Sequence, residues 1–136
     1  MKVFIKNITI IMILLLFDIL WIYFNYNMYN DSVLSIQKSK INMNLYSTIL
    51  AYILVIYTIF YISIPLTIKN INKNDNIISK LYKSFLYGGS VGLSVYGIYN
   101  CTSKSLYSNY EWKVALYDTI WGIFLNTIIV FIYLII

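Results

Sequence analysis

The chain has 136 residues, of which 60% are hydrophobic and only 11% are charged. Soluble domains carry about 25% charged residues, so this composition excludes a soluble fold, and its hydrophobicity excludes a disordered chain. Histidine is absent and Cys101 is the single cysteine. A Ser–His or Cys–His nucleophile, an intramolecular disulfide and a histidine or cysteine zinc site are therefore excluded as well. A small integral membrane protein remains.

The net charge of +5 does not indicate a nucleic-acid partner. The ten lysines are scattered singly between long apolar runs and form neither a basic face nor a nucleic-acid motif. Lysines that flank apolar segments set the orientation in the membrane or meet anionic lipid headgroups. We therefore expect the lipid bilayer, and no nucleic acid, as the partner of this surface.

The charged residues divide the chain into four apolar windows, residues 7–30, 41–68, 84–103 and 114–136. Each is long enough for a helix to cross about 30 Å of hydrocarbon, and none shows the alternation of membrane β-strands. We predict an all-α, polytopic membrane protein, an antiparallel four-transmembrane-helix bundle that forms a single membrane domain over residues 1–136. The predicted spans are approximately 7–28, 44–67, 82–101 and 114–135, with the third in the centre.

The lysines favour a topology with both termini inside. That topology places six of them on the inner side (Lys2, Lys6, Lys69, Lys73, Lys80 and Lys83) and four on the outer side (Lys38, Lys40, Lys104 and Lys113). No small-residue cleavage site follows the first apolar run, so we interpret it as a retained helix.

The connections between the spans are short. The outer segment 31–40 is either a short interfacial helix or an irregular loop. The Asn-rich inner segment 69–80 suits a solvated hairpin connection. Pro65 indicates a kink or a helix end in the second span.

Asp18 and Asp118 are the two charged residues inside the apolar windows. An aspartate at the membrane centre costs about 2.5–3.5 kcal/mol, so we expect both side chains to face the interior of the bundle. Each is followed three residues later by a tryptophan, Trp21 or Trp121, on the same helix face. The two motifs are either halves of an inverted repeat, as in many transporters, or neutral hydrogen-bonding contacts between helices.

The third window is rich in small residues. Gly88 and Gly92 have the GxxxG spacing that permits close helix approach. Together with Gly97 and Gly122 they are candidates for helix packing, within the chain or in a homodimer. The outer end of this window and its neighbours form a polar, aromatic cluster, and we expect a cleft there. Its candidate binding residues, beside the four residues of the two motifs, are Tyr96, Tyr99, Asn100, Thr102 and Trp112.

The chain resembles an uncharacterised membrane family, domain-of-unknown-function family 2177, over essentially its whole length. The resemblance is carried by Asp18-x-x-Trp21, Tyr29, Pro65, Tyr96-Gly97-Ile98-Tyr99 and Asp118-x-x-Trp121-Gly122. It implies four spans and the same outer cluster, in proteins of bacteria and some large DNA viruses, and it implies no activity. Where the family usually has an Asp after the second tyrosine, this chain has Asn100.

Three functions fit these observations. The first is transport- or channel-like binding of a proton, a cation or a small polar solute through Asp18 and Asp118. The second is a structural or assembly protein, with a homo-oligomer or a membrane-protein partner, in a cell membrane or an internal or virion membrane. The third is a small lipid-binding or lipid-modifying protein, in which the two carboxylates hold Mg²⁺ with a substrate phosphate. We predict no catalytic residue, no resident metal and no cofactor, and hence no enzyme.

Overall fold

The computed structural model describes residues 2–136, and over this range the chain is all-helical, without strands, as predicted. Its five helices are α1 (Lys2–Phe24), α2 (Tyr26–Gln37), α3–η1–α4, α5–η2–α6 and α7 (Trp112–Ile135). The third is made of α3 (Leu45–Thr58), the π-helical η1 (Ile59–Ser63) and α4 (Ile64–Lys69). The fourth is made of α5 (Ile77–Lys83), the π-helical η2 (Ser84–Gly89) and α6 (Ser90–Leu106).

Three of these helices are long and apolar enough to cross a membrane, namely Lys2–Phe24, Leu45–Lys69 and Trp112–Ile135. The predicted third span, 82–101, lies within the helix α5–η2–α6, whose glycines, serines and Asn100 make it less apolar. Large apolar side chains are exposed along all of the long helices. Such a surface suits hydrocarbon better than water.

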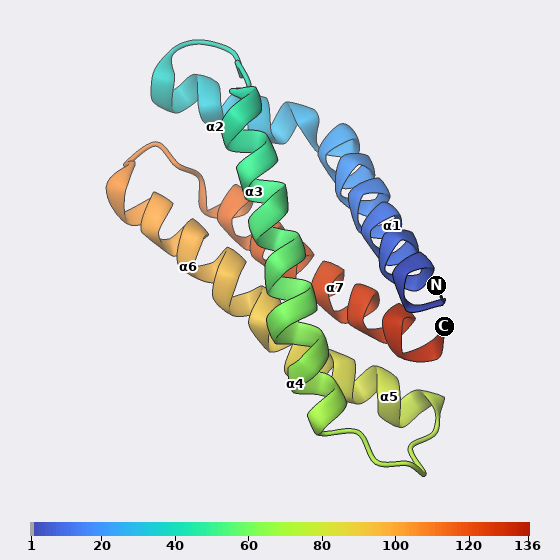
Figure 1. Ribbon diagram of the computed structural model, residues 1–136. Helices are drawn as coiled ribbons and strands as arrows, with labels where there is room; N and C mark the ends of the chain where they lie inside the picture. Colours follow the sequence, from blue (N-terminus) through green and yellow to red (C-terminus); the bar gives the residue numbers. More distant parts are fainter. Residues whose placement is uncertain (1) are drawn as a thin grey trace.

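The helices run back and forth between two ends of the molecule (Figure 1). One end, which we call the α2 end, carries α2 and the connection 107–111. The other, the terminal end, carries both termini and the connection 70–76 (Figure 1). Asn44 and Asn76 begin two of the helices, because their side chains accept the N–H of Ser47 (3.1 Å) and Ser79 (2.8 Å).

The segment between the first two predicted spans is helical rather than irregular, but α2 begins at Tyr26, earlier than the expected 31–40. α1 ends at Phe24, so the helix stops before residue 28, where the predicted first span ends. Lys38 ends α2 in the left-handed conformation (φ 61°) and donates its N–H to the carbonyl of Leu34 at 3.0 Å. Pro65 does not end its helix. The π-turn of η1 precedes it, and the helix continues to Lys69.

α7, rather than the predicted third span, is the central helix. It contacts α1, α2, α4, α5, α6 and both π-helical segments. In the half of the molecule toward the terminal end its buried face packs against α1, η1 and α4, in an apolar core made of Ile10, Leu14, Ile59, Ile64, Leu125, Ile129 and Val130. The core is interrupted by one polar contact between helices, in which Ser63 donates its hydroxyl to the side-chain oxygen of Asn126 at 3.0 Å.

Glycines set the spacing between α6 and α7. A Cβ atom on Gly92 would lie 2.2 Å from the carbonyl oxygen of Gly122, and one on Gly122 would lie 2.2 Å from the ring of Tyr96. At Gly88 the nearest atom, on Val130, would be 3.0 Å away, and at Gly97 the nearest atom would be at an ordinary 3.6 Å. The two helices therefore approach most closely at Gly92 and Gly122.

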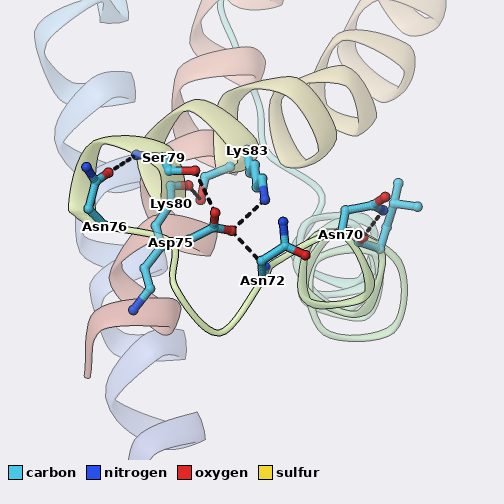
Figure 2. A network of polar contacts seen from close by, with 9 residues as sticks. Asn70, Asn72, Asp75, Asn76, Ser79, Lys80 and Lys83 are labelled. Carbon is cyan, nitrogen blue, oxygen red and sulfur yellow. Dashed lines mark hydrogen bonds and ion pairs between the residues drawn. The ribbon is translucent and has the colours of Figure 1, made fainter.

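The connection at the terminal end is organised by Asp75 (Figure 2). Its carboxylate accepts hydrogen bonds from the ammonium group of Lys83, from the backbone N–H of Asn72 (2.8 Å) and from the hydroxyl of Ser79 (3.0 Å). The hydrogen bond from Lys83, followed by that from the backbone of Asn72, holds the pKa of Asp75 below its ordinary value. The polar connection predicted from the sequence is thus an ordered turn.

We predict that Gly92→Ala destabilises the protein by about 1–3 kcal/mol, because α6 cannot stay in contact with the backbone of α7. Gly97→Ala is the matched control and is expected to leave stability unchanged or slightly raised, since alanine favours helix. Thermal unfolding of the purified variants in detergent, followed by circular dichroism, measures both. Equal melting temperatures for the two variants would contradict the packing described above.

We predict that the connection 70–76 loosens in acid. The pKa of Asp75 is lowered by folding, so its contribution to stability is present above the ordinary carboxyl value of about 4 and is lost as the pH falls through the lower folded value. Hydrogen exchange of the backbone around Asn72 and Ser79, corrected for intrinsic rates, should rise in that window. In Asp75→Asn the exchange should already be fast at neutral pH and should show no such step.

Candidate functional site

Asp18 and Asp118 are half-buried on two neighbouring helices, α1 and α7. All four of their carboxylate oxygens accept hydrogen bonds from neutral donors. For Asp18 the donors are the indole N–H of Trp121 (2.8 Å) and the hydroxyl of Tyr52 (3.0 Å). For Asp118 they are the hydroxyl of Tyr29 (2.7 Å) and the amide of Asn100 (2.8 Å).

The two tryptophan side chains link one Asp-x-x-Trp motif to the other. Their rings stack with centroids 4.5 Å apart and an angle of 3° between the planes. Trp121 donates to Asp18 directly, whereas Trp21 donates to the hydroxyl of Tyr29 at 2.8 Å, which in turn donates to Asp118. Each tryptophan therefore supports the carboxylate of the other motif rather than the one on its own helix. The two links differ, because Tyr29 lies between Trp21 and Asp118 whereas no residue lies between Trp121 and Asp18.

Asn100 is the buried centre of the polar cluster on the α6 side, at 1% exposure. Its amide nitrogen donates hydrogen bonds to Asp118 and to the backbone carbonyl of Tyr96, both at 2.8 Å, and its side-chain oxygen accepts a hydrogen bond from the hydroxyl of Tyr110. A carboxylate at this position would face Asp118 without a proton to donate. The amide, which both donates and accepts, is therefore matched to its surroundings.

The two phenols outside the spans remain hydrogen-bond donors. Burial, followed by the charge of Asp118, raises the pKa of Tyr29 above that of an ordinary phenol. Burial also raises the pKa of Tyr110, with smaller effects from Tyr99 and Asp118. Both hydroxyls therefore stay protonated through the physiological range, and the hydrogen bonds to Asp118 and Asn100 keep their direction.

Two cavities meet at the carboxylates. The first, of about 610 Å³, lies between α1, α3 and α6, and the second, of about 480 Å³, lies beneath α2. Both are bordered by Asp18, Ile22, Tyr96, Tyr99 and Asp118. Within residues 2–136 the one ion pair is Lys83–Asp75 at the terminal end, so no described lysine neutralises either carboxylate.

Most of the residues singled out from the sequence come together here. Seven of them lie at the cavities or in the hydrogen-bond cluster, namely Asp18, Trp21, Tyr96, Tyr99, Asn100, Asp118 and Trp121. Thr102 and Trp112 do not. Both are exposed and border neither cavity, because Thr102 lies two residues beyond Asn100 on another face of α6 and Trp112 is the first residue of α7.

The sequence did not single out three tyrosines and a serine as binding residues. Tyr29 belongs to the family resemblance but is not predicted to bind a ligand, and neither Tyr52 nor Tyr110 is predicted to do so. Among 15 tyrosines nothing in the spacing marks these three. Ser32 borders the second cavity at 2% exposure, and its hydroxyl has no hydrogen-bond partner.

The chain matches one family, described as "Predicted membrane protein (DUF2177)", over residues 3–134. The match agrees with the resemblance carried by the Asp-x-x-Trp motifs. No curated protein matches the chain. No solved structure matches it.

We predict that Tyr29→Phe loosens α2 and lowers stability by about 1–3 kcal/mol, because Trp21 loses its acceptor and Asp118 loses a donor within a half-buried cluster. Tyr26→Phe, on the same helix but exposed and outside the cluster, is the control and should have no effect. Thermal unfolding measures the stability, and near-ultraviolet circular dichroism of the stacked tryptophans reports on the cluster itself. A near-ultraviolet spectrum and a melting temperature equal to those of the wild type in Tyr29→Phe would contradict this role of the two hydrogen bonds of Tyr29.

Proposed function

Since this chain belongs to the DUF2177 family of predicted membrane proteins, we propose that it spans a membrane four times with both termini inside. In this proposal Asp18 and Asp118 bind a proton, a cation or a small polar solute, in a transport- or channel-like role. The carrying observation is the pair of half-buried carboxylates at the common wall of two cavities, with no ion-pair partner among residues 2–136.

Besides the three apolar helices, this proposal requires the helix α5–η2–α6, which contains the predicted third span, to cross the membrane. This helix packs along α7 through Gly88, Gly92 and the segment η2, so its glycine face is covered by protein, and Ser84 and Asn100 are buried as well. Glycine and serine faces are typical of helix contacts in membranes. The excess of lysines at the terminal end supports the orientation.

Energetics support a ligand at the carboxylates. Two ionised groups in an apolar surrounding are costly even when each oxygen accepts a hydrogen bond, because tyrosine, tryptophan and asparagine bring no positive charge. A proton or a cation removes that cost. The site therefore favours positively charged or hydrogen-bond-donating species over anions.

In this structure the two cavities are more accessible from the α2 end than from the terminal end. Toward the terminal end, the core of Ile10, Leu14, Leu125 and Ile129 is completely buried and fills the space between α1 and α7. Passage to the other side would require these helices to repack. The segments η1 and η2 lie at this level, and π-turns of this kind frequently mark sites of function in helices.

The test is flux in liposomes that contain the purified protein. Proton movement down an imposed pH gradient is followed with an enclosed dye, and rubidium uptake is followed in parallel. We expect flux above that of empty liposomes, and we expect Asp18→Asn and Asp118→Asn each to reduce it by about tenfold or more, since removing the charge removes the ligand's partner. Asn keeps one oxygen acceptor, so helix packing is largely retained.

Two carboxylates that border neither cavity provide the controls, Asp31 on α2 and Asp75 at the terminal end, and neither Asp31→Asn nor Asp75→Asn should change the flux. A folded wild type without flux would overturn the transport role. Equal flux from Asp18→Asn, Asp118→Asn and the wild type would overturn the role of the carboxylates and leave them as contacts between helices.

A further inference from the structure

The walls around the carboxylates are aromatic. Tyr52 borders the first cavity, and Tyr96 and Tyr99 border both cavities. A carboxylate beside several phenol rings is the surrounding in which proteins bind organic ammonium groups, since the ring faces attract a cation without the cost of stripping water from a second charge. A bare metal ion requires six to eight oxygen ligands for Ca²⁺ or an octahedral set for Mg²⁺, which these rings do not provide.

The remainder of the first cavity is mostly apolar. Its two threonines, Thr48 and Thr58, donate their hydroxyls to the backbone carbonyls of Asn44 and Leu54. Ile22 of α1, Leu54 and Val55 of α3 and Val95 of α6 form most of the wall away from the carboxylates, together with Met43 and Ala51. Its volume of about 610 Å³ lies in the range of small-molecule sites. A proton or a hydrated inorganic cation would leave this apolar space unused, whereas an alkyl or aryl group would fill it.

The second cavity carries a free hydroxyl. Other buried serines donate their hydroxyl, Ser63 to Asn126 and Ser84 to the carbonyl of Lys80. The hydroxyl of Ser32 is equally buried, borders the cavity beneath α2 and has no partner. A buried hydroxyl without a hydrogen bond costs free energy, so a polar group of a ligand would be stabilised there. Gln37 and Asn42, on the same cavity, are neutral and add no charge.

We propose that the two cavities form one binding site for an amphiphilic organic ammonium compound. The ammonium group lies between Asp18 and Asp118 against the tyrosines, the hydrocarbon part fills the cavity between α1, α3 and α6, and a hydroxyl or amide group reaches Ser32. This inference rests on the proposed binding at the two carboxylates and adds the chemical class of the ligand.

The test uses three probes with six carbons each: hexylamine carries an ammonium group alone, 2-aminohexan-1-ol carries an ammonium group and a hydroxyl, and hexan-1-ol carries a hydroxyl alone. Binding to the protein in nanodiscs is measured by calorimetry at pH 7, with empty nanodiscs as the baseline for partition into lipid. Trp21 and Trp121, which stack beside Asp18, give a second readout through their fluorescence. We expect both amines to bind and hexan-1-ol, which lacks the charge, to bind at least about tenfold more weakly.

Variants separate the parts of the site. The double variant Asp18→Asn, Asp118→Asn should lose affinity for both amines by about tenfold or more, whereas Asp31→Asn, beside Ser32 in the sequence, should not. Ala51→Phe narrows the first cavity and should weaken both amines without touching a carboxylate. Ser32→Ala should weaken 2-aminohexan-1-ol by about threefold to tenfold and leave hexylamine unchanged, as expected for one lost hydrogen bond.

The outcomes distinguish this inference from the transport proposal. Equal binding of hexylamine and hexan-1-ol, or unchanged amine binding in both the double Asp variant and Ala51→Phe, overturns the ammonium site. Asp-dependent proton or rubidium flux without amine binding overturns the ammonium site alone. Amine binding with the expected variant effects, but without flux, supports the ammonium site and overturns only transport.

Discussion

The hydrogen bonding of two carboxylates in an apolar helical protein is the constraint on which the rest of this structure depends. Asp18 and Asp118 need donors that a hydrocarbon surrounding cannot supply, and the donors come from four different helices. Tyr29 comes from α2, Tyr52 from α3, Asn100 from α6 and Trp121 from α7, while Trp21 of α1 donates to Tyr29. Satisfying these two side chains thus fixes how the helices of the α2 end sit relative to one another.

Close packing supplies the complementary half of the arrangement. Gly92 and Gly122 bring α6 against α7, so that Tyr96 lies against the backbone of α7 and Asn100 can reach Asp118. Toward the terminal end no ionised group needs a partner in the core, and aliphatic side chains fill the space instead. The molecule therefore divides into a polar, hollow half and an apolar, filled half, and both candidate cavities lie in the first.

Much of this organisation follows from the sequence, and the physical reasons are specific. The cost of an aspartate in an apolar window indicates Asp18 and Asp118 as special residues. The spacing of three residues predicts that each aspartate and its tryptophan share one helix face. Periodicity could not show that each tryptophan serves the other motif, because that depends on the relative depth of α1 and α7. It also could not separate Tyr52 from the many exposed tyrosines, nor show that the segment before Lys38 turns back as a helix from Tyr26. Those features are set by tertiary contacts.

The amide of Asn100 has a consequence for the net charge of this site. Its two N–H groups and its oxygen are all engaged, with Asp118, the backbone of Tyr96 and the hydroxyl of Tyr110. Residue 100 and residue 118 therefore form a charge-matched pair, in which an amide faces an acid. An acid in place of this amide would give the pair one more negative charge unless a shared proton compensated. The net charge of the site is accordingly set by residue 100 as well as by Asp18 and Asp118.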